Sequence, residues 1–166
     1  MAQSGVHRRH GDFENSRSSW DGRFHKEKRL MINDTVNRVE VEGSLDEVID
    51  RITEALNREG FGILTRIDLH SKFREKLGKE ISPAVILGAC NPQLAYEAYQ
   101  CNSDVASLLP CNVVVREVSA GRCSVELARP SVMMEMLGDE KLVALSRDAD
   151  QRLERCLSHL ETKRAA

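Results

Sequence analysis

The chain has 166 residues, 41% of them hydrophobic, so we expect one domain with a proper core and exclude disorder for most of its length. Aromatic residues make up only 4% and the formal net charge is −2, which argues against stacking platforms for single-stranded nucleic acid and against general polyanion binding. There is no apolar run of the roughly 20 residues that a membrane span needs and no signal-peptide pattern, so we expect a cytoplasmic protein with reduced cysteines and no membrane contact.

Residues 1–32 are predicted to be a disordered basic tail. Residues 1–30 carry seven Lys or Arg against four acidic residues and show no hydrophobic period. A basic arm for an acidic partner is the less favoured alternative, and Met31 is a possible alternative start. The sequence predicts one folded domain over 33–162 and a disordered C-terminus over 163–166.

The domain is predicted to begin with a strand and a helix. Alternating apolar and polar residues indicate a strand over about 35–42. Ser44 and Glu47 have the spacing of a capping box, in which each side chain bonds the backbone N–H of the other residue. The helix that follows is expected to end at Gly60.

A second strand and a short helix come next. The apolar residues of the strand, together with one threonine, are expected to share one face: Phe61, Ile63, Thr65 and Ile67. Asp68 is expected to cap a short helix that ends at Gly78. The apolar residues of this helix recur at every fourth position: Leu69, Phe73 and Leu77.

The third strand, over 84–90, is apolar on both faces, which is typical of a strand covered on both sides or close to a subunit contact. Asn91 is a favourable N-cap, and Pro92 suits the first position of a helix that runs to about Gln100. A further helical turn is expected near 104–109.

The last part of the domain is predicted to be a hairpin followed by helices. The strands cover 111–118 and 123–129, with Gly121 in the turn. Ser131 is expected to cap a turn that contains three methionines. The final helix, over about 139–161, should bury one apolar stripe: Leu142, Leu145, Ala149, Leu153, Cys156, Leu157 and Leu160. These elements predict an α+β fold, a two-layer sandwich whose mixed or antiparallel sheet of about five strands has helices packed on one face.

Three phrases of the sequence resemble the domain-of-unknown-function 302 family: EGFGILTRIDLHSKFREKLGKEI, ILGACNP and LLPCNVVV. The resemblance covers about residues 35–160. It implies a compact α+β domain that self-associates, so we expect a homodimer, and it brings no established activity. Family members often have Asp-Pro after the final strand, where this chain has Arg129-Pro130.

The repeated Cys-Asn phrase indicates a candidate site made of Cys90, Asn91, Pro92, Cys111 and Asn112. Cys90 directly precedes a helix start, where unpaired amides favour a thiolate and lower its pKa. A site of this kind could be a thiol or soft-metal site, or a small-molecule pocket without thiol chemistry. The alternative is that both cysteines only pack as small apolar residues. We predict no cofactor and no metal-ligand set.

Whether Cys90 and Cys111 meet depends on strand direction. If strands 84–90 and 111–118 are parallel, the two cysteines lie at opposite ends of the sheet. If they are antiparallel, both lie at one end, and the helical turn near 104–109 favours this arrangement. The sequence thus predicts a small-ligand-binding or interaction module that self-associates. The alternative is a thiol-dependent redox or soft-metal-binding protein that uses Cys90 with Cys111, and the sequence does not decide whether the protein is an enzyme.

Overall fold

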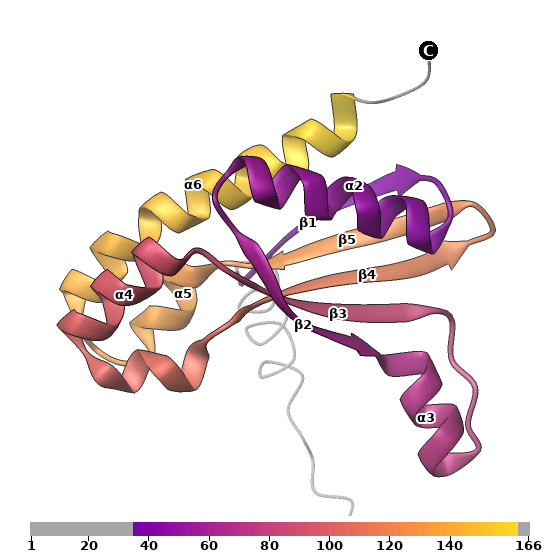
Figure 1. Ribbon diagram of the computed structural model, residues 1–166, viewed down its shortest axis with the longest axis horizontal. Coiled ribbons are helices and arrows are strands. Elements are labelled where there is room, and N and C mark those ends of the chain that lie inside the picture. Colours follow the sequence, from indigo (N-terminus) through magenta and orange to yellow (C-terminus); the bar gives the residue numbers. More distant parts are fainter. Residues whose placement is uncertain (1–34, 163–166) are drawn as a thin grey trace, which may run out of the picture.

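The computed structural model describes residues 35–162, which contain a five-stranded sheet with helices around it (Figure 1). The strands are β1 (Val36–Glu42), β2 (Gly62–Asp68), β3 (Ala84–Cys90), β4 (Cys111–Ser119) and β5 (Arg122–Ala128). Their order across the sheet is β1-β5-β4-β3-β2, and each neighbouring pair is antiparallel. The predicted α+β sandwich is confirmed, with an antiparallel sheet. The predicted tails, 1–32 and 163–166, lie outside the described residues.

The helices of the described region are α2 (Leu45–Arg58), α3 (Leu69–Leu77), α4 (Pro92–Cys101), the 3-10 helix η1 (Ser103–Leu108), α5 (Pro130–Glu135) and α6 (Glu140–Thr162). Helices α2 and α6 lie along one face of the sheet (Figure 1). Helices α4, η1 and α5 gather at the end of the sheet where β3 finishes, and α3 lies at the other end. Within residues 35–162, no helix is both long and apolar enough to cross a membrane.

Helix α2 crosses the sheet, because the strands before and after it, β1 and β2, form opposite edges. Its start is the predicted capping box: the Ser44 hydroxyl accepts the Glu47 N–H at 3.4 Å, and the Glu47 carboxylate accepts the Ser44 N–H at 2.8 Å. One face of the helix is buried against the sheet and α6: Val48, Ile49, Ile52, Ala55 and Leu56. The capping box therefore fixes where the crossing helix begins.

The main core lies between the sheet and the pair α2 and α6. Alternate strand residues point into it and are almost fully buried: Val85, Leu87, Ala89, Val113, Val115, Val125 and Leu127. The predicted stripe of α6 is buried except for Leu145, which is half-buried. Fully burying an apolar side chain of this size contributes about 1.5–3 kcal/mol, so this layer is the main source of stability.

The prediction that Phe61, Ile63, Thr65 and Ile67 share one face is wrong. Phe61 precedes the strand, and β2 contains a register shift between Ile63 and Thr65. Ile63 is opposite Ala89 and packs against the core, whereas Ile67 is opposite Ile86 on the uncovered face. The extra residue at Leu64 reverses the alternation of side chains, and no local signal in the sequence marked it.

Two predicted caps are also wrong. The Asp68 side chain makes no cap bond to α3, because its carboxylate accepts the Arg66 guanidinium at 2.9 Å. Ser131 lies inside α5, and its N–H and hydroxyl both donate to the Asp150 carboxylate of α6. In both cases the side chain forms a hydrogen bond with a charged side chain and makes none with the backbone at the helix start.

Candidate functional site

The two Cys-Asn phrases meet at one end of the sheet. Strands β3 and β4 are antiparallel, with Ala89 opposite Cys111 and Gly88 opposite Asn112. Cys90 is the last residue of β3, and Cys111 is the first residue of β4. The antiparallel alternative, which brings both cysteines to the same end, is therefore confirmed.

The five candidate residues do not all face the same region. Opposite residues of an antiparallel pair point to the same face, so Cys111 and Ala89 lie on the face covered by α2 and α6. Asn112 points to the other face with Gly88 and is exposed, and Pro92 is exposed at the first turn of α4. Cys90, at the end of β3, nevertheless lines the same cavity as Asn91 and Cys111, whereas Pro92 and Asn112 do not line it.

Asn91 is buried and connects two parts of the fold. Its side-chain oxygen accepts the Leu94 N–H at 3.2 Å, which confirms the predicted N-cap of α4. Its amide nitrogen lies 3.5 Å from the Glu59 carbonyl oxygen, just after α2. A Cβ atom at Gly60 would come within 2.9 Å of the same nitrogen. Asn91 thus fastens the loop after α2 to the start of α4.

Strand β3 is closely packed against its neighbours at Gly88, on the face of the sheet that α2 and α6 do not cover. A Cβ atom built on Gly88 would collide with Thr65 Oγ1 of β2 and would lie 2.6 Å from Cγ of Pro110. Because Gly88 has no side chain, β2 can approach β3 from one side and Pro110 from the other. This contact sets the position of Cys111, which directly follows Pro110.

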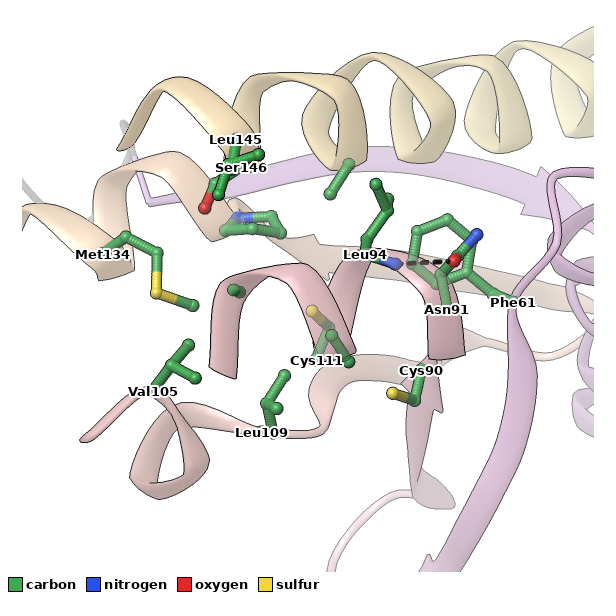
Figure 2. Close-up of a pocket in the computed structure, with 14 residues that line it drawn as sticks. Phe61, Cys90, Asn91, Leu94, Val105, Leu109, Cys111, Met134, Leu145 and Ser146 are labelled. Atoms are coloured by element: carbon green, nitrogen blue, oxygen red, sulfur yellow. Dashed lines mark hydrogen bonds between the residues drawn. The ribbon is translucent and has the colours of Figure 1, made fainter. Parts of the chain in front are cut away.

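A partly open cavity of about 40 Å³ lies between the ends of β3 and β4 and the surrounding helices (Figure 2). Cys90 and Cys111 contribute from the strands, and Leu145 and Ser146 from α6 on the opposite side. The rest of the wall is mostly apolar and comes from the loop before β2 and from α4, η1 and α5: Phe61, Leu94, Ala95, Ala98, Val105, Leu109, Pro130 and Met134, together with Ala149 of α6. At roughly 10–15 Å³ for each water-sized probe, this space accepts a small group of a few atoms.

The polar atoms of the wall have little hydrogen-bonding capacity left. The Ser146 hydroxyl donates to the Leu142 carbonyl at 2.7 Å, and the Asn91 side chain is engaged as described above. The two thiols are the remaining polar groups among the side chains that line the cavity. An uncharged, largely apolar ligand therefore suits this cavity better than an ionic one.

Burial raises the pKa of the Cys90 thiol, and it raises the pKa of Cys111 to about 11, with smaller contributions from Cys90 and from Asp150. The prediction that Cys90 is an acidified thiol is contradicted. Burial among apolar side chains disfavours the charged thiolate and is the cause of the raised pKa of Cys90. Both thiols are thus largely protonated near neutral pH.

Sequence reasoning did not find most of the cavity wall. Met134 was predicted only as one of three methionines in the turn after Ser131, and it packs in a small apolar cluster with Ala98, Val105 and Leu142. Ala149 was recognised as part of the α6 stripe, but nothing showed that it faces a cavity. Among residues 35–162, no group of three or more His, Cys, Asp or Glu side chains is placed to hold a metal ion.

The fold and site together define a class: an α+β sandwich with an antiparallel five-stranded sheet and a thiol-lined apolar cavity at one end. The family profile described as "Domain of unknown function DUF302" matches residues 37–160, and the chain belongs to this family. A comparison with curated proteins found no match.

A solved structure supports the same assignment. The chain is similar to an uncharacterized conserved protein DUF302 from Bacillus stearothermophilus, whose crystal structure superimposes with a TM-score of 0.71. The two sequences are 33% identical, and the match covers 76% of this chain and 98% of the other. This similarity extends over nearly the whole of that protein.

Proposed function

We propose that this protein is a small-ligand-binding module, and that its ligand is a small uncharged molecule or an apolar group of a larger one. The observation that carries the proposal is the cavity at the end of β3 and β4, with its apolar wall and two protonated thiols. No arginine, lysine or carboxylate lies among its lining residues, so the wall offers no counter-ion for a charged ligand.

The two thiols make the cavity selective for one kind of uncharged ligand. A protonated thiol is a weak donor and a polarizable contact, so polarizable uncharged groups fit this wall better than strongly hydrated ones. The thiol-dependent redox or soft-metal alternative has less support, because burial holds the pKa of both cysteines above its usual value. Alkylation of Cys90 in a variant that keeps only this cysteine should accelerate above pH 9; a rate that already levels off below pH 8 would favour the thiolate alternative.

Xenon tests whether the cavity accepts a ligand, because it is uncharged, polarizable and about the size of the space. We expect saturable shifts of the methyl signals of Leu94, Ala98 and Ala149 when the protein is studied by NMR under xenon pressure. Ala149→Leu fills the cavity and should abolish the shifts of Leu94 and Ala98. The matched control is Ala144→Leu, on the exposed side of the same helix, which should leave them unchanged.

The natural ligand is tested by extraction. Protein purified without denaturation would be extracted with organic solvent, and the extract analysed by mass spectrometry. We expect an uncharged small molecule that is enriched with the wild type and with Ala144→Leu but absent from Ala149→Leu. Equal extracts from all three proteins, together with unsaturable xenon shifts, would contradict the proposal.

A further inference from the structure

Exposed apolar side chains of the described region are concentrated along the edge strand β2, on α3 and at the strand ends beside them. Nine large hydrophobic residues of the described region are exposed, and six of them lie in β2, in α3, in the loop before β3 or at the end of β4: Leu64, Ile67, Phe73, Leu77, Ile81 and Val118. We call these six residues the β2–α3 surface. A concentration of this kind is typical of a protein–protein contact.

Helix α3 is held in place but not covered. The imidazole Nδ1 of His70 lies 3.0 Å from the carbonyl oxygen and 3.2 Å from the amide nitrogen of Ala84, so the first turn of α3 is fixed to the start of β3. No residue of α3 is buried, although Leu69, Phe73 and Leu77 form an apolar stripe. Leu77 is 64% exposed. An anchored amphipathic helix of this kind presents a preformed contact surface.

Strand β2 is an edge strand that, within residues 35–162, pairs with β3 alone. Leu64 and Ile67 are exposed along it. The other edge of the sheet, β1, exposes the charged side chains of Arg38, Glu40 and Glu42 and no large apolar one. Strand β2 also carries charges, but Arg66 and Asp68 pair with each other at 2.9 Å. Of the two edges in the described region, β2 is therefore the one that offers exposed apolar side chains to another chain.

Opposite charges flank this edge. Helix α3 carries Lys72, Arg74 and Lys76, all exposed, against one acidic residue. Helix α2 presents an exposed acidic row with four-residue spacing: Asp46, Asp50 and Glu54. The first of these lies 3.9 Å from the Arg66 guanidinium of β2, so the row runs beside the edge strand.

We propose that the β2–α3 surface is a homodimer interface in which the β2 strands of two copies pair antiparallel about a two-fold axis. Antiparallel pairing reverses the partner strand, so each α3 comes to lie beside the first half of the other β2, near Leu64 and the acidic row of α2. A second copy is the occupant that fits, because each chain supplies the open edge, the apolar helix and both signs of charge. None of the six residues of the β2–α3 surface lines the cavity, so this inference does not rest on ligand binding.

The apolar part of the interface is tested by replacing exposed residues, which leaves the core intact. We expect the full chain to sediment at twice 18.7 kDa, and Phe73→Glu with Leu77→Glu to sediment as a monomer with unchanged circular dichroism. The matched control is Tyr96→Glu, an equally exposed apolar residue of α4, which should remain dimeric. A wild type that stays monomeric up to about 0.1 mM, or a double variant that stays dimeric, would overturn the proposal.

The charged part is tested by a pair of reversals. Variant one is Arg74→Glu with Lys76→Glu, and variant two is Asp50→Lys with Glu54→Lys. Each variant alone brings like charges together and should dimerise about tenfold more weakly than the wild type. Mixed together, they restore opposite charges at both α3–α2 contacts, so a heterodimer of near wild-type affinity should form. No recovery on mixing would overturn the arrangement, and protection of Leu64 in a monomeric full chain would assign residues 1–34 as the occupant instead.

Discussion

The two ends of the sheet differ in how their apolar side chains are covered. At the end where β3 finishes, α4, η1, α5 and α6 close over Cys90 and Cys111 and leave only a cavity of about 40 Å³. At the end where β3 begins, α3 is fixed by His70 but covers little, and Phe73 and Leu77 stay exposed. The apolar side chains at the first end are thus mostly covered by helices, whereas those of α3 at the second end are exposed to solvent.

This difference shows that an apolar helix stripe in a sequence can be either a buried core face or an exposed contact face. The stripes of α3 and α6 have the same helical spacing, yet α6 buries almost every member and α3 buries none. Periodicity therefore tells which residues share a helix face, and only the neighbouring elements decide whether that face is core or contact surface. The predictions that follow test this contrast, from the largest expected effect to the smallest.

The largest contrast is between two leucines. Leu142 is fully buried in the small cluster with Val105 and Met134, so Leu142→Ala should lower the free energy of unfolding by about 3 kcal/mol. Leu77→Ala, at the uncovered end, should change it by about 0.5 kcal/mol or less. Urea unfolding at a concentration where the chain is monomeric measures both. Similar losses for the two variants would show that α3 is packed within its own chain.

The second prediction concerns pH and the closed end. The pKa of Cys111 is raised from 9.0 to about 11 by burial, so between these values the folded state holds a proton that the unfolded state has lost. The stability due to the neutral thiol is complete below about pH 9. It should then fall by about 1.4 kcal/mol per pH unit up to about pH 11.

Urea unfolding of the wild type and of Cys111→Ala between pH 8 and pH 11 checks this slope. The stability difference between the two proteins should shift in favour of the variant as the pH rises through this window. The contribution of Cys156, whose pKa burial raises to about 12, is common to both and cancels. Parallel curves would mean that the Cys111 thiol is in contact with solvent.

The third prediction tests the close approach beside Cys111. Gly88→Ala places a Cβ against Thr65 and Pro110, so we expect a loss of about 2 kcal/mol in the free energy of unfolding. Gly62 in the edge strand has nothing within 4 Å of its Cβ position and is the matched control. Gly62→Ala should leave stability within about 0.5 kcal/mol of the wild type. Equal costs would argue against the tight packing of Pro110 on β3.

The smallest expected effect is the difference in stability between replacing Asn91 and replacing Asn112, the asparagines of the two Cys-Asn phrases. Asn91→Ala removes the N-cap of α4 and the link to Glu59, which should cost about 1 kcal/mol by thermal or urea unfolding. Asn112→Ala, at an exposed position on the uncovered face, should have no measurable cost. A larger loss for Asn112 than for Asn91 would contradict the arrangement described.

Local signals in the sequence predicted much of the fold. The capping box at Ser44, the Asn91-Pro92 helix start and the hairpin at Gly121 depend on residues within a few positions of one another, and all three are present. Two caps failed: Asp68 bonds Arg66, only two residues away, and Ser131 bonds a residue of another helix. For Ser131 the partner, Asp150, lies 19 residues away, and its carboxylate cannot be anticipated from spacing.

The candidate site was predicted in part. The helical turn expected near 104–109 favoured the antiparallel arrangement that brings Cys90 and Cys111 to one end, and this arrangement is present. The cavity itself was not predictable, because its walls come from helices distant in the sequence, with Met134 and Ala149 closing it from α5 and α6. The direction of the Cys90 pKa shift failed for the same reason: burial depends on those walls, and a helix start alone does not indicate it.

The sequence by itself determined the approximate positions of the strands and helices, which residues share a helix face, and the α+β class of the fold, since these follow from short-range backbone and side-chain preferences. Only the tertiary structure decided that an extra residue at Leu64 turns Ile67 outward, that Asn91 fastens two distant segments while Asn112 faces solvent, and that one apolar helix stripe is core and another is surface. The physical reason is that burial and charge are properties of a residue's neighbours in space, which folding brings together from distant positions in the chain.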